Sequence, residues 1–282
     1  MGSLSIKLLV LALFIQPFAL NAADEEQLNY RASYSGFFSV GSQIPIADVV
    51  LTTQTVASDA DYLETELSVT SAPYDFVESL YPIRYRFRSW YWRDRSASLA
   101  SEYYEKTKSE KHNLIYLDDP EKDFVTRNLL KSNEIDLLSL QAGDYAEENG
   151  LSPTGRLTGS QFDRLGLLQR VRYLNLVPGQ ELELPVTNGK ALMRYRVRVE
   201  AAENLLIAGR SQAALKLRFD GMEQDENDHE QHAHRPVFIW LSNDVERVPL
   251  KVVSRQALGK FVLELTSPYS PTDSKVAKVN LG

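Results

Sequence analysis

Residues 83–92, with the sequence IRYRFRSWYW, alternate between two kinds of side chain. In an extended chain, one face would carry Ile83, Tyr85, Phe87 and Tyr91. The opposite face would carry Arg84, Arg86, Arg88, Trp90 and Trp92. Because successive side chains of a strand point to opposite sides, this period of two predicts a β-strand with one apolar and one charged face.

Runs with the same period extend along most of the chain. They cover residues 30–38, 47–53, 62–69, 98–107, 112–117, 123–127, 181–186, 193–200, 205–219, 237–241, 245–253 and 258–266. Their regular spacing is typical of an antiparallel meander, and the turn formers at 59–61 predict a hairpin between the runs that flank them. We therefore expect a mainly β fold, built as an extended, curved antiparallel sheet or an open barrel.

One segment, residues 161–173, has a helical period instead. Phe162, Leu165, Leu168 and Val171 recur every third residue, and Arg164, Arg170 and Arg172 supply the charge. Ser160 is a candidate cap for the start of this helix, and Pro178 with Gly179 closes the connection that follows. The pattern predicts one helix packed on the apolar face of the sheet.

The stretch before this helix, residues 131–160, breaks the strand pattern. It combines a short helical pattern at 135–140 with an acidic patch and several glycines and a proline, which predicts a loop-rich insertion. An ordinary surface excursion is the alternative interpretation. We expect a single β-rich domain over residues 23–267 and a loosely ordered tail over 268–282.

The first two dozen residues have the layout of a secretory signal peptide. Lys7 precedes an apolar run at 8–15, and small residues follow at Ala22 and Ala23. A membrane anchor is the alternative, but about twenty consecutive apolar residues are needed to span a bilayer, and Gln16 and Pro17 interrupt this run. We expect residues 1–22 to be a signal peptide that is cleaved after Ala22 or Ala23.

Composition narrows the classes of function. The 282-residue chain has a net charge of −7 and no cysteine. A net acidic chain lacks the broad basic surface expected of a nucleic-acid binder, and without cysteine it forms no disulfide and carries no lipid on a processed terminal cysteine. No motif indicates a cofactor site, and the sequence has neither a Gly-x-Ser-x-Gly elbow nor a cysteine nucleophile. No catalytic residue is therefore predicted.

The charged face of residues 83–92 is the first candidate binding site. Arg84, Arg86 and Arg88 could match repeated negative groups of a ligand, and Trp90 and Trp92 offer stacking surfaces for a sugar. A solvated face, with arginine stems covering the aromatic rings, is the alternative. A second row at Arg194, Arg196 and Arg198 favours that alternative because it repeats the pattern elsewhere.

His229, His232 and His234 form the second candidate site. Imidazoles two and three residues apart in a flexible loop could converge on a transition metal. The spacing differs from the metalloprotease motif, which needs two histidines four apart on a helix. A solvated hairpin loop is the alternative interpretation.

The C-terminal hairpin carries distinctive residues: Trp240, Asp244, Arg247, Pro249 and Gly259. Asn243 and Asp244 are turn formers, and Arg247 is placed to pair with Asp244 across the turn. This segment resembles the closing motif of domain-of-unknown-function family 3108, exported proteins of Gram-negative bacteria. The resemblance extends to Asp163, Leu165, Arg172, Pro178 and Gly179, and to an opening strand with Tyr30, Tyr34, Gly36, Phe37, Phe38 and Gly41.

The resemblance implies a β-rich periplasmic domain in which these motif residues are structural, and it supplies no catalytic residues. Our leading hypothesis is a non-enzymatic periplasmic protein that binds or carries an envelope lipid or glycan in the concavity of its sheet. A scaffold subunit that docks a partner protein of the envelope, and a hydrolase of cell-wall or polysaccharide material, are the alternatives.

Overall fold

The computed structural model describes residues 26–39, 42–55, 62–107, 110–118, 124–129, 152–156, 161–187, 192–224, 230–257 and 259–269. Within these ranges, fifteen strands form one antiparallel sheet. The predicted fold class is therefore confirmed. The predicted signal peptide at residues 1–22, and the tail beyond residue 269, lie outside the described residues.

The N-terminal half of the chain forms a meander in which each strand pairs with the next. Its strands are β1 (Glu26–Gly36), β2 (Ile44–Thr55), β3 (Tyr62–Thr70), β4 (Arg84–Trp92), β5 (Ser98–Lys106), β6 (Glu110–Asp118), β7 (Phe124–Leu129) and β8 (Ser152–Arg156). The hairpin predicted around residues 59–61 exists as the β2–β3 pair. Two short helices are attached to this half, η1 (Phe37–Ser39) and α1 (Asp75–Leu80).

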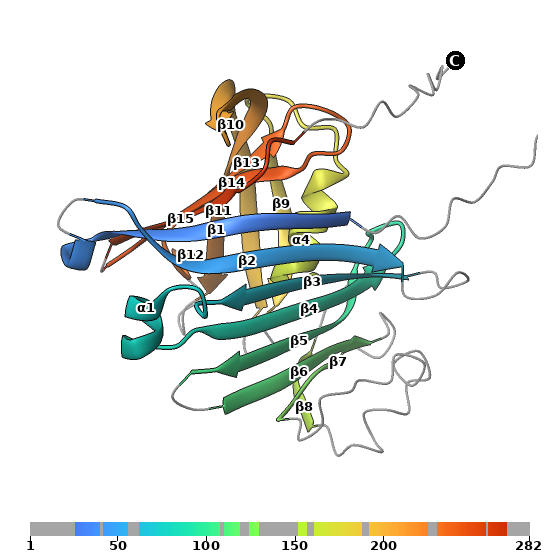
Figure 1. Ribbon diagram of the computed structural model, residues 1–282. Helices are drawn as coiled ribbons and strands as arrows, with labels where there is room; N and C mark the ends of the chain where they lie inside the picture. The colour runs from blue at the N-terminus through green and yellow to red at the C-terminus, as the bar shows by residue number, and fades with distance from the viewer. Residues whose placement is uncertain are drawn as a thin grey trace, which may run out of the picture.

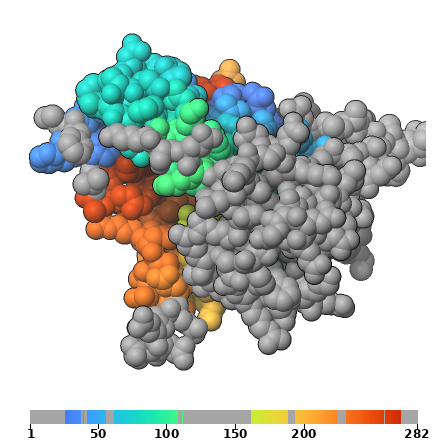
Figure 2. Space-filling view, turned by 90° about the horizontal axis from the view of Figure 1, so that it is seen from below, coloured from blue at the N-terminus to red at the C-terminus, as the bar shows by residue number. Residues whose placement is uncertain are grey.

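The C-terminal half forms a second meander. Its strands are β9 (Glu181–Thr187), β10 (Leu192–Ile207), β11 (Arg210–Gln224), β12 (Glu230–His232), β13 (Val237–Ser242), β14 (Pro249–Gln256) and β15 (Gly259–Leu265). The last strand, β15, pairs with the first, β1, so the two meanders share one sheet. In Figure 2, residues of the red C-terminal strands accordingly lie between the cyan N-terminal half and the orange strands.

The sheet curves around helix α4 (Arg164–Arg172), as Figure 1 shows. The three residues before the helix connect the two meanders: Gln161 O accepts from Ser98 N of β5 at 2.9 Å, and Phe162 forms a parallel bridge with Val186 of β9. On one side, Leu167 and Val171 of α4 pack in a core with β9–β11 and β13. On the other side, Gln169 donates to Thr65 of β3 at 3.1 Å. The helix therefore fills much of the concavity.

The structure corrects four details of the sequence interpretation. Helix α4 is capped by Asp163, whose carboxylate accepts from Leu165 N and Gly166 N, and not by Ser160, which lies outside the described residues. The run at 205–219 is not one strand, because Ala208 and Gly209 take positive φ angles and turn the chain between β10 and β11. Strand β14 begins at Pro249, so the predicted strand at 245–253 starts too early. Strand β8 lies within the predicted insertion, whose other residues, including 135–140, are outside the described residues.

Gly259, at the start of β15, marks a close approach of two strands. Its φ angle is +150°, and a Cβ atom there would lie 2.6 Å from Ser35 O of β1. We expect Gly259→Ala to lower the free energy of unfolding by about 2 kcal/mol, because the strained backbone and the clash with a backbone oxygen add together.

Gly209→Ala is the matched control for this prediction. Gly209 also has a positive φ angle, but nothing lies within 4 Å of its Cβ position. Urea unfolding should show a smaller loss, near 1 kcal/mol, for the control. Equal losses in the two variants would mean that the β1–β15 approach does not require glycine.

Candidate functional site

A pocket of about 360 Å³ opens between α4 and the C-terminal strands, and we call it the α4 pocket. Its apolar wall consists of Leu167, Leu168, Phe219, Val237 and Ile239. Its polar residues are Arg164, Tyr195, His234, Ser254 and Gln256. Ligand pockets of about 300–1,000 Å³ that combine an apolar lining with a few polar groups are typical of small-molecule sites.

The position of α4 creates this pocket. Leu167 is buried in the core that α4 shares with β9–β11 and β13, whereas Leu168 is only partly buried and Arg164 is exposed. The first turn of the helix therefore leaves a space over the inner face of β13 and β14, where Ile239 and Ser254 lie. Because Arg164 lies at this edge, the pocket opens to solvent beside a fixed positive charge.

A chain of hydrogen bonds forms the polar rim. The hydroxyl of Tyr195 lies 2.6 Å from His234 Nε2, and His234 Nδ1 lies 2.9 Å from the carbonyl oxygen of Arg235. A carbonyl only accepts, so Nδ1 carries the proton and Nε2 accepts from Tyr195 in the neutral ring. Burial raises the pKa of Tyr195, and the Arg164 guanidinium opposes this shift.

Gly221 of β11 makes room for this arrangement. A Cβ atom at residue 221 would lie 2.6 Å from His234 Nε2 and 3.2 Å from the Tyr195 ring. The imidazole therefore packs directly against the backbone of β11, which holds the rim beside the apolar wall. This arrangement can orient the polar end of an amphiphile while the apolar wall binds its chain.

The predicted ligand residues on β4 lie elsewhere. None of Arg84, Arg86, Arg88, Trp90 and Trp92 lines the α4 pocket, and each arginine meets a carboxylate of this chain. Arg84 pairs with Glu78 at 2.7 Å, and both Arg86 and Arg88 pair with Glu102, which is 1% exposed. Ligand binding by these residues stays a prediction.

The two tryptophans of this face have different surroundings. Trp90 is buried and its indole N–H donates to Glu64 at 2.7 Å, whereas Trp92 is 37% exposed. Burial raises the pKa of Glu64, and the hydrogen bond from Trp90 opposes the shift. Much of this face is thus internally paired, although it carries three arginines.

Two of the predicted metal ligands, His232 and His234, have different partners in the structure. His229 lies outside the described residues. His232 Nδ1 lies 4.0 Å from Asp220 Oδ1, whereas His234 uses both ring nitrogens in the pocket rim. Across the residues that the structure describes, no three His, Asp or Glu side chains are grouped to hold a metal ion. A metal site that includes His229 stays a prediction.

The predicted structural motif residues come together at the C-terminal end of α4. Arg172, 7% exposed, donates to Glu26 of β1 at 2.6 and 2.8 Å and to the carbonyls of Glu246 and Arg247. Asp244 accepts from the backbone N–H groups of Glu246 and Arg247, at 2.9 and 3.1 Å. The predicted side-chain pair of Asp244 and Arg247 is wrong, because the Asp244 carboxylate is used by the turn and the Arg247 guanidinium donates to Asn243.

Three further motif residues have structural contacts. The carbonyl of Pro249 accepts from the buried hydroxyl of Tyr30 at 2.8 Å. Trp240 packs at the second core cluster, formed by β1, β2, β14 and neighbouring residues, and its indole donates to Glu203. Together with the close approach at Gly259, these contacts join β1 to the C-terminal strands.

The comparison with protein families gives a match in the C-terminal half of the chain. Residues 151–266 match the family DUF3108, described as protein of unknown function. The resemblance inferred from the sequence is confirmed over this segment. The DUF3108 segment contains α4, the motif residues above and all ten residues that line the α4 pocket. The opening strand around Tyr30 and Phe37 lies outside the match.

Three solved structures resemble this chain at low sequence identity, and the first of them has the same kind of fold. A β-barrel-like protein of domain of unknown function DUF1849 from Brucella abortus is 10% identical, with a TM-score of 0.50, over 85% of this chain and 94% of that chain. The hypothetical lipoprotein YmcC from Escherichia coli is 10% identical, with a TM-score of 0.32, over 89% and 87% of the two chains. A Bacteroides fragilis protein with a YmcC-like fold is 8% identical, with a TM-score of 0.29, over 87% and 95%.

No curated protein matches this sequence. Among the described helices, none is long and apolar enough to cross a membrane.

Sequence reasoning missed the α4 pocket. Its apolar residues come from a helix and two strands that are brought together only in the folded sheet, and its polar residues carry no motif for such a pocket. One signal was available: His234 and Arg164 each border an apolar run. No spacing in the sequence places these two residues at the same pocket.

Proposed function

We propose that this protein is a non-enzymatic periplasmic carrier that binds the apolar part of an envelope lipid in the α4 pocket. In this proposal, residues 1–22 are a signal peptide that is removed on export. The observation that carries the proposal is the pocket itself, in which five apolar side chains face a rim of Arg164, Tyr195 and His234.

Three properties support a lipid chain as the ligand. The wall contains leucine, isoleucine, valine and phenylalanine, which favour hydrocarbon. The volume of about 360 Å³ is at the lower end of the range for ligand sites, which suits part of one acyl chain. Arg164 at the opening offers a positive charge to an acidic or hydrogen-bonding head group.

Filling the pocket should prevent lipid from being retained. Ser254 lines the α4 pocket and is only partly buried, so Ser254→Phe adds a ring to the space without adding charge. Losing the burial of two or three methylene groups, each about 0.8 kcal/mol, should reduce retained lipid at least about tenfold. Native mass spectrometry of protein purified from the periplasm of a Gram-negative host measures the bound fraction.

A second variant and a control make this test decisive. Leu168→Glu places a carboxylate in the apolar wall and should have the same effect, whereas Leu206→Glu changes a residue that is 71% exposed and lines neither described pocket. Urea unfolding confirms that each variant is folded. The proposal fails if wild-type protein carries no lipid in repeated preparations, or if all three folded variants retain as much lipid as wild type.

A further inference from the structure

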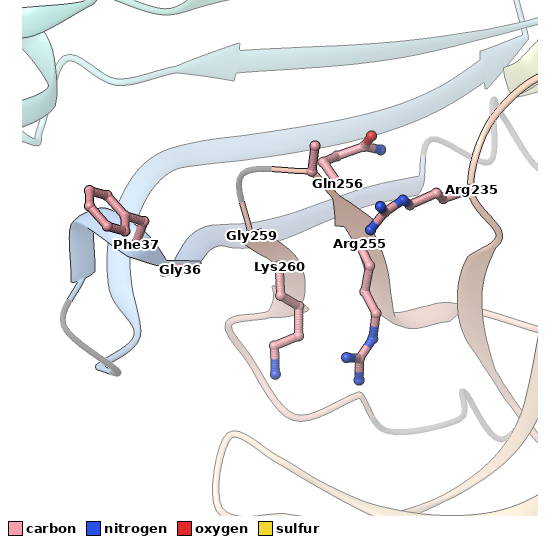
Figure 3. A pocket seen from close by; sticks show the side chains of 8 residues that line it. Gly36, Phe37, Arg235, Arg255, Gln256, Gly259 and Lys260 are labelled. Carbon is pink, nitrogen blue, oxygen red and sulfur yellow. The ribbon is translucent and has the colours of Figure 1, made fainter.

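A second depression, of about 490 Å³, lies where the β14–β15 turn meets the end of β1. Its charged residues are Arg235, Arg255 and Lys260, and Gly36, Phe37 and Gln256 also line it. Figure 3 shows the side chains of Arg255 and Lys260 extending in the same direction from neighbouring strands, with Arg235 approaching from the side of β13. We call this surface the cationic depression.

Among the residues that the structure describes, no carboxylate balances the charges in this depression. Arg255 and Lys260 are direct cross-strand partners, and like charges in such positions repel each other. No carboxylate of any described residue forms an ion pair with Arg235, Arg255 or Lys260. The next charged pair along the same face of these two strands, beyond Val253 and Val262, is complementary, since Lys251 meets Glu264 at 2.8 Å.

Three cations line one depression although the chain has a net charge of −7. Elsewhere, Arg84 and Arg88 of β4 and Arg172 of α4 are paired with acidic groups. Three cations at one concave site, with no acidic partner in the described part of the chain, therefore favour an external anion. Two guanidinium groups and an ammonium group suit a phosphate, which accepts several charge-assisted hydrogen bonds.

The cationic depression adjoins the α4 pocket. Gln256 lines both, and Arg235 follows His234 directly in the chain. On the far rim, the side chain of Phe37 is 87% exposed, which offers an apolar surface beside the cations. Arg255 and Lys260 point to the opposite face of their strands from Ser254 and Gln256. An anion bound in the depression would therefore reach the apolar pocket around the end of β14 at Gln256, with the exposed ring of Phe37 on its other side.

We propose that the cationic depression binds the phosphate group of an anionic phospholipid whose acyl chain enters the α4 pocket. This inference rests on the proposed function, because it assigns the head group of the same ligand. The depression supplies selectivity for charge, and the α4 pocket supplies the apolar contact.

The test compares charge reversal at two places. Arg255→Glu combined with Lys260→Glu reverses the depression, whereas Arg198→Glu combined with Arg210→Glu changes the net charge equally at exposed residues that line neither described pocket. Binding is measured to vesicles that contain phosphatidylglycerol and, separately, to inorganic phosphate and to dodecanol. We expect at least about a tenfold loss of phosphatidylglycerol binding in the depression variant alone, with dodecanol binding unchanged.

Each other outcome overturns a defined part of the idea. If both double variants weaken phosphatidylglycerol binding equally, the effect is one of net charge and the depression is not the site. If inorganic phosphate binds wild type as tightly as the phospholipid does, the ligand is a soluble phosphate and not a lipid. If wild type binds phosphatidylglycerol through the depression but never binds dodecanol, the carrier function fails while the phosphate site stands.

Discussion

Replacing Arg172 with alanine is expected to lower the free energy of unfolding by about 3 kcal/mol, the lower end of the range for removing one partner of a buried ion pair. The guanidinium holds Glu26 of β1, and it also donates to the carbonyls of Glu246 and Arg247. Burial opposes the charged form, but the Glu26 carboxylate outweighs it, so the pKa of Arg172 lies above its ordinary value. Urea unfolding followed by tryptophan fluorescence measures the loss.

Two further variants separate the charge of Arg172 from its geometry. Arg172→Lys keeps the charge but not the two-pronged contact with Glu26, so its stability should lie between wild type and alanine. Arg196 forms an exposed pair with Glu183 on β9, and Arg196→Ala should leave the urea midpoint nearly unchanged. If Arg172→Ala shifts the midpoint no more than Arg196→Ala does, the contacts of Arg172 do not join α4 to β1 in the way described here.

Asp163→Ala should be comparably destabilising, with a loss of about 3 kcal/mol. The Asp163 carboxylate caps α4 by accepting from Leu165 N and Gly166 N, and it accepts from the hydroxyl of Ser89 on β4 at 2.5 Å. Alanine removes the cap and leaves the Ser89 hydroxyl, which is fully buried, without its acceptor. Thermal and urea unfolding measure the effect.

Asp163→Asn is the matched control for this prediction. Its side-chain oxygen can still accept from the two backbone N–H groups, and its amide can donate to Ser89, so the loss should be near 1 kcal/mol. An asparagine variant as unstable as the alanine variant would show that the negative charge, and not the hydrogen-bond geometry, stabilises this position.

Alternation of apolar and polar residues predicted most of the strands, and with them the fold class. The alternation matches the burial most clearly in β10, where Met193, Tyr195, Val197 and Val199 are buried and Arg194 and Arg198 are exposed. The errors have local causes. The turn at Ala208 and Gly209 was missed because Ala208 is not a usual turn former, although it takes a φ angle of +45°.

The surroundings of α4 show why the site was harder to predict. The helical period predicts Arg172 as one of the charged residues of an amphipathic helix, yet Asp163, Gln169 and Arg172 are all buried. A helix on the surface of a sheet needs one apolar face, but α4 lies inside a curved sheet and is enclosed on both sides. Its polar residues are therefore partners of β1, β3 and β4, and not a solvated face.

The amino-acid sequence alone determined that the chain is a cysteine-free, acidic, mainly β protein with a helix near residues 161–173 and a C-terminal half like that of DUF3108. These properties follow from short-range patterns, because strand and helix periods are local. The α4 pocket and the cationic depression were decided only by the tertiary structure. The α4 pocket depends on the packing of α4 against β10, β11, β13 and β14. The cationic depression depends on the pairing of β1 with β15, which brings together residues as distant as Phe37 and Lys260.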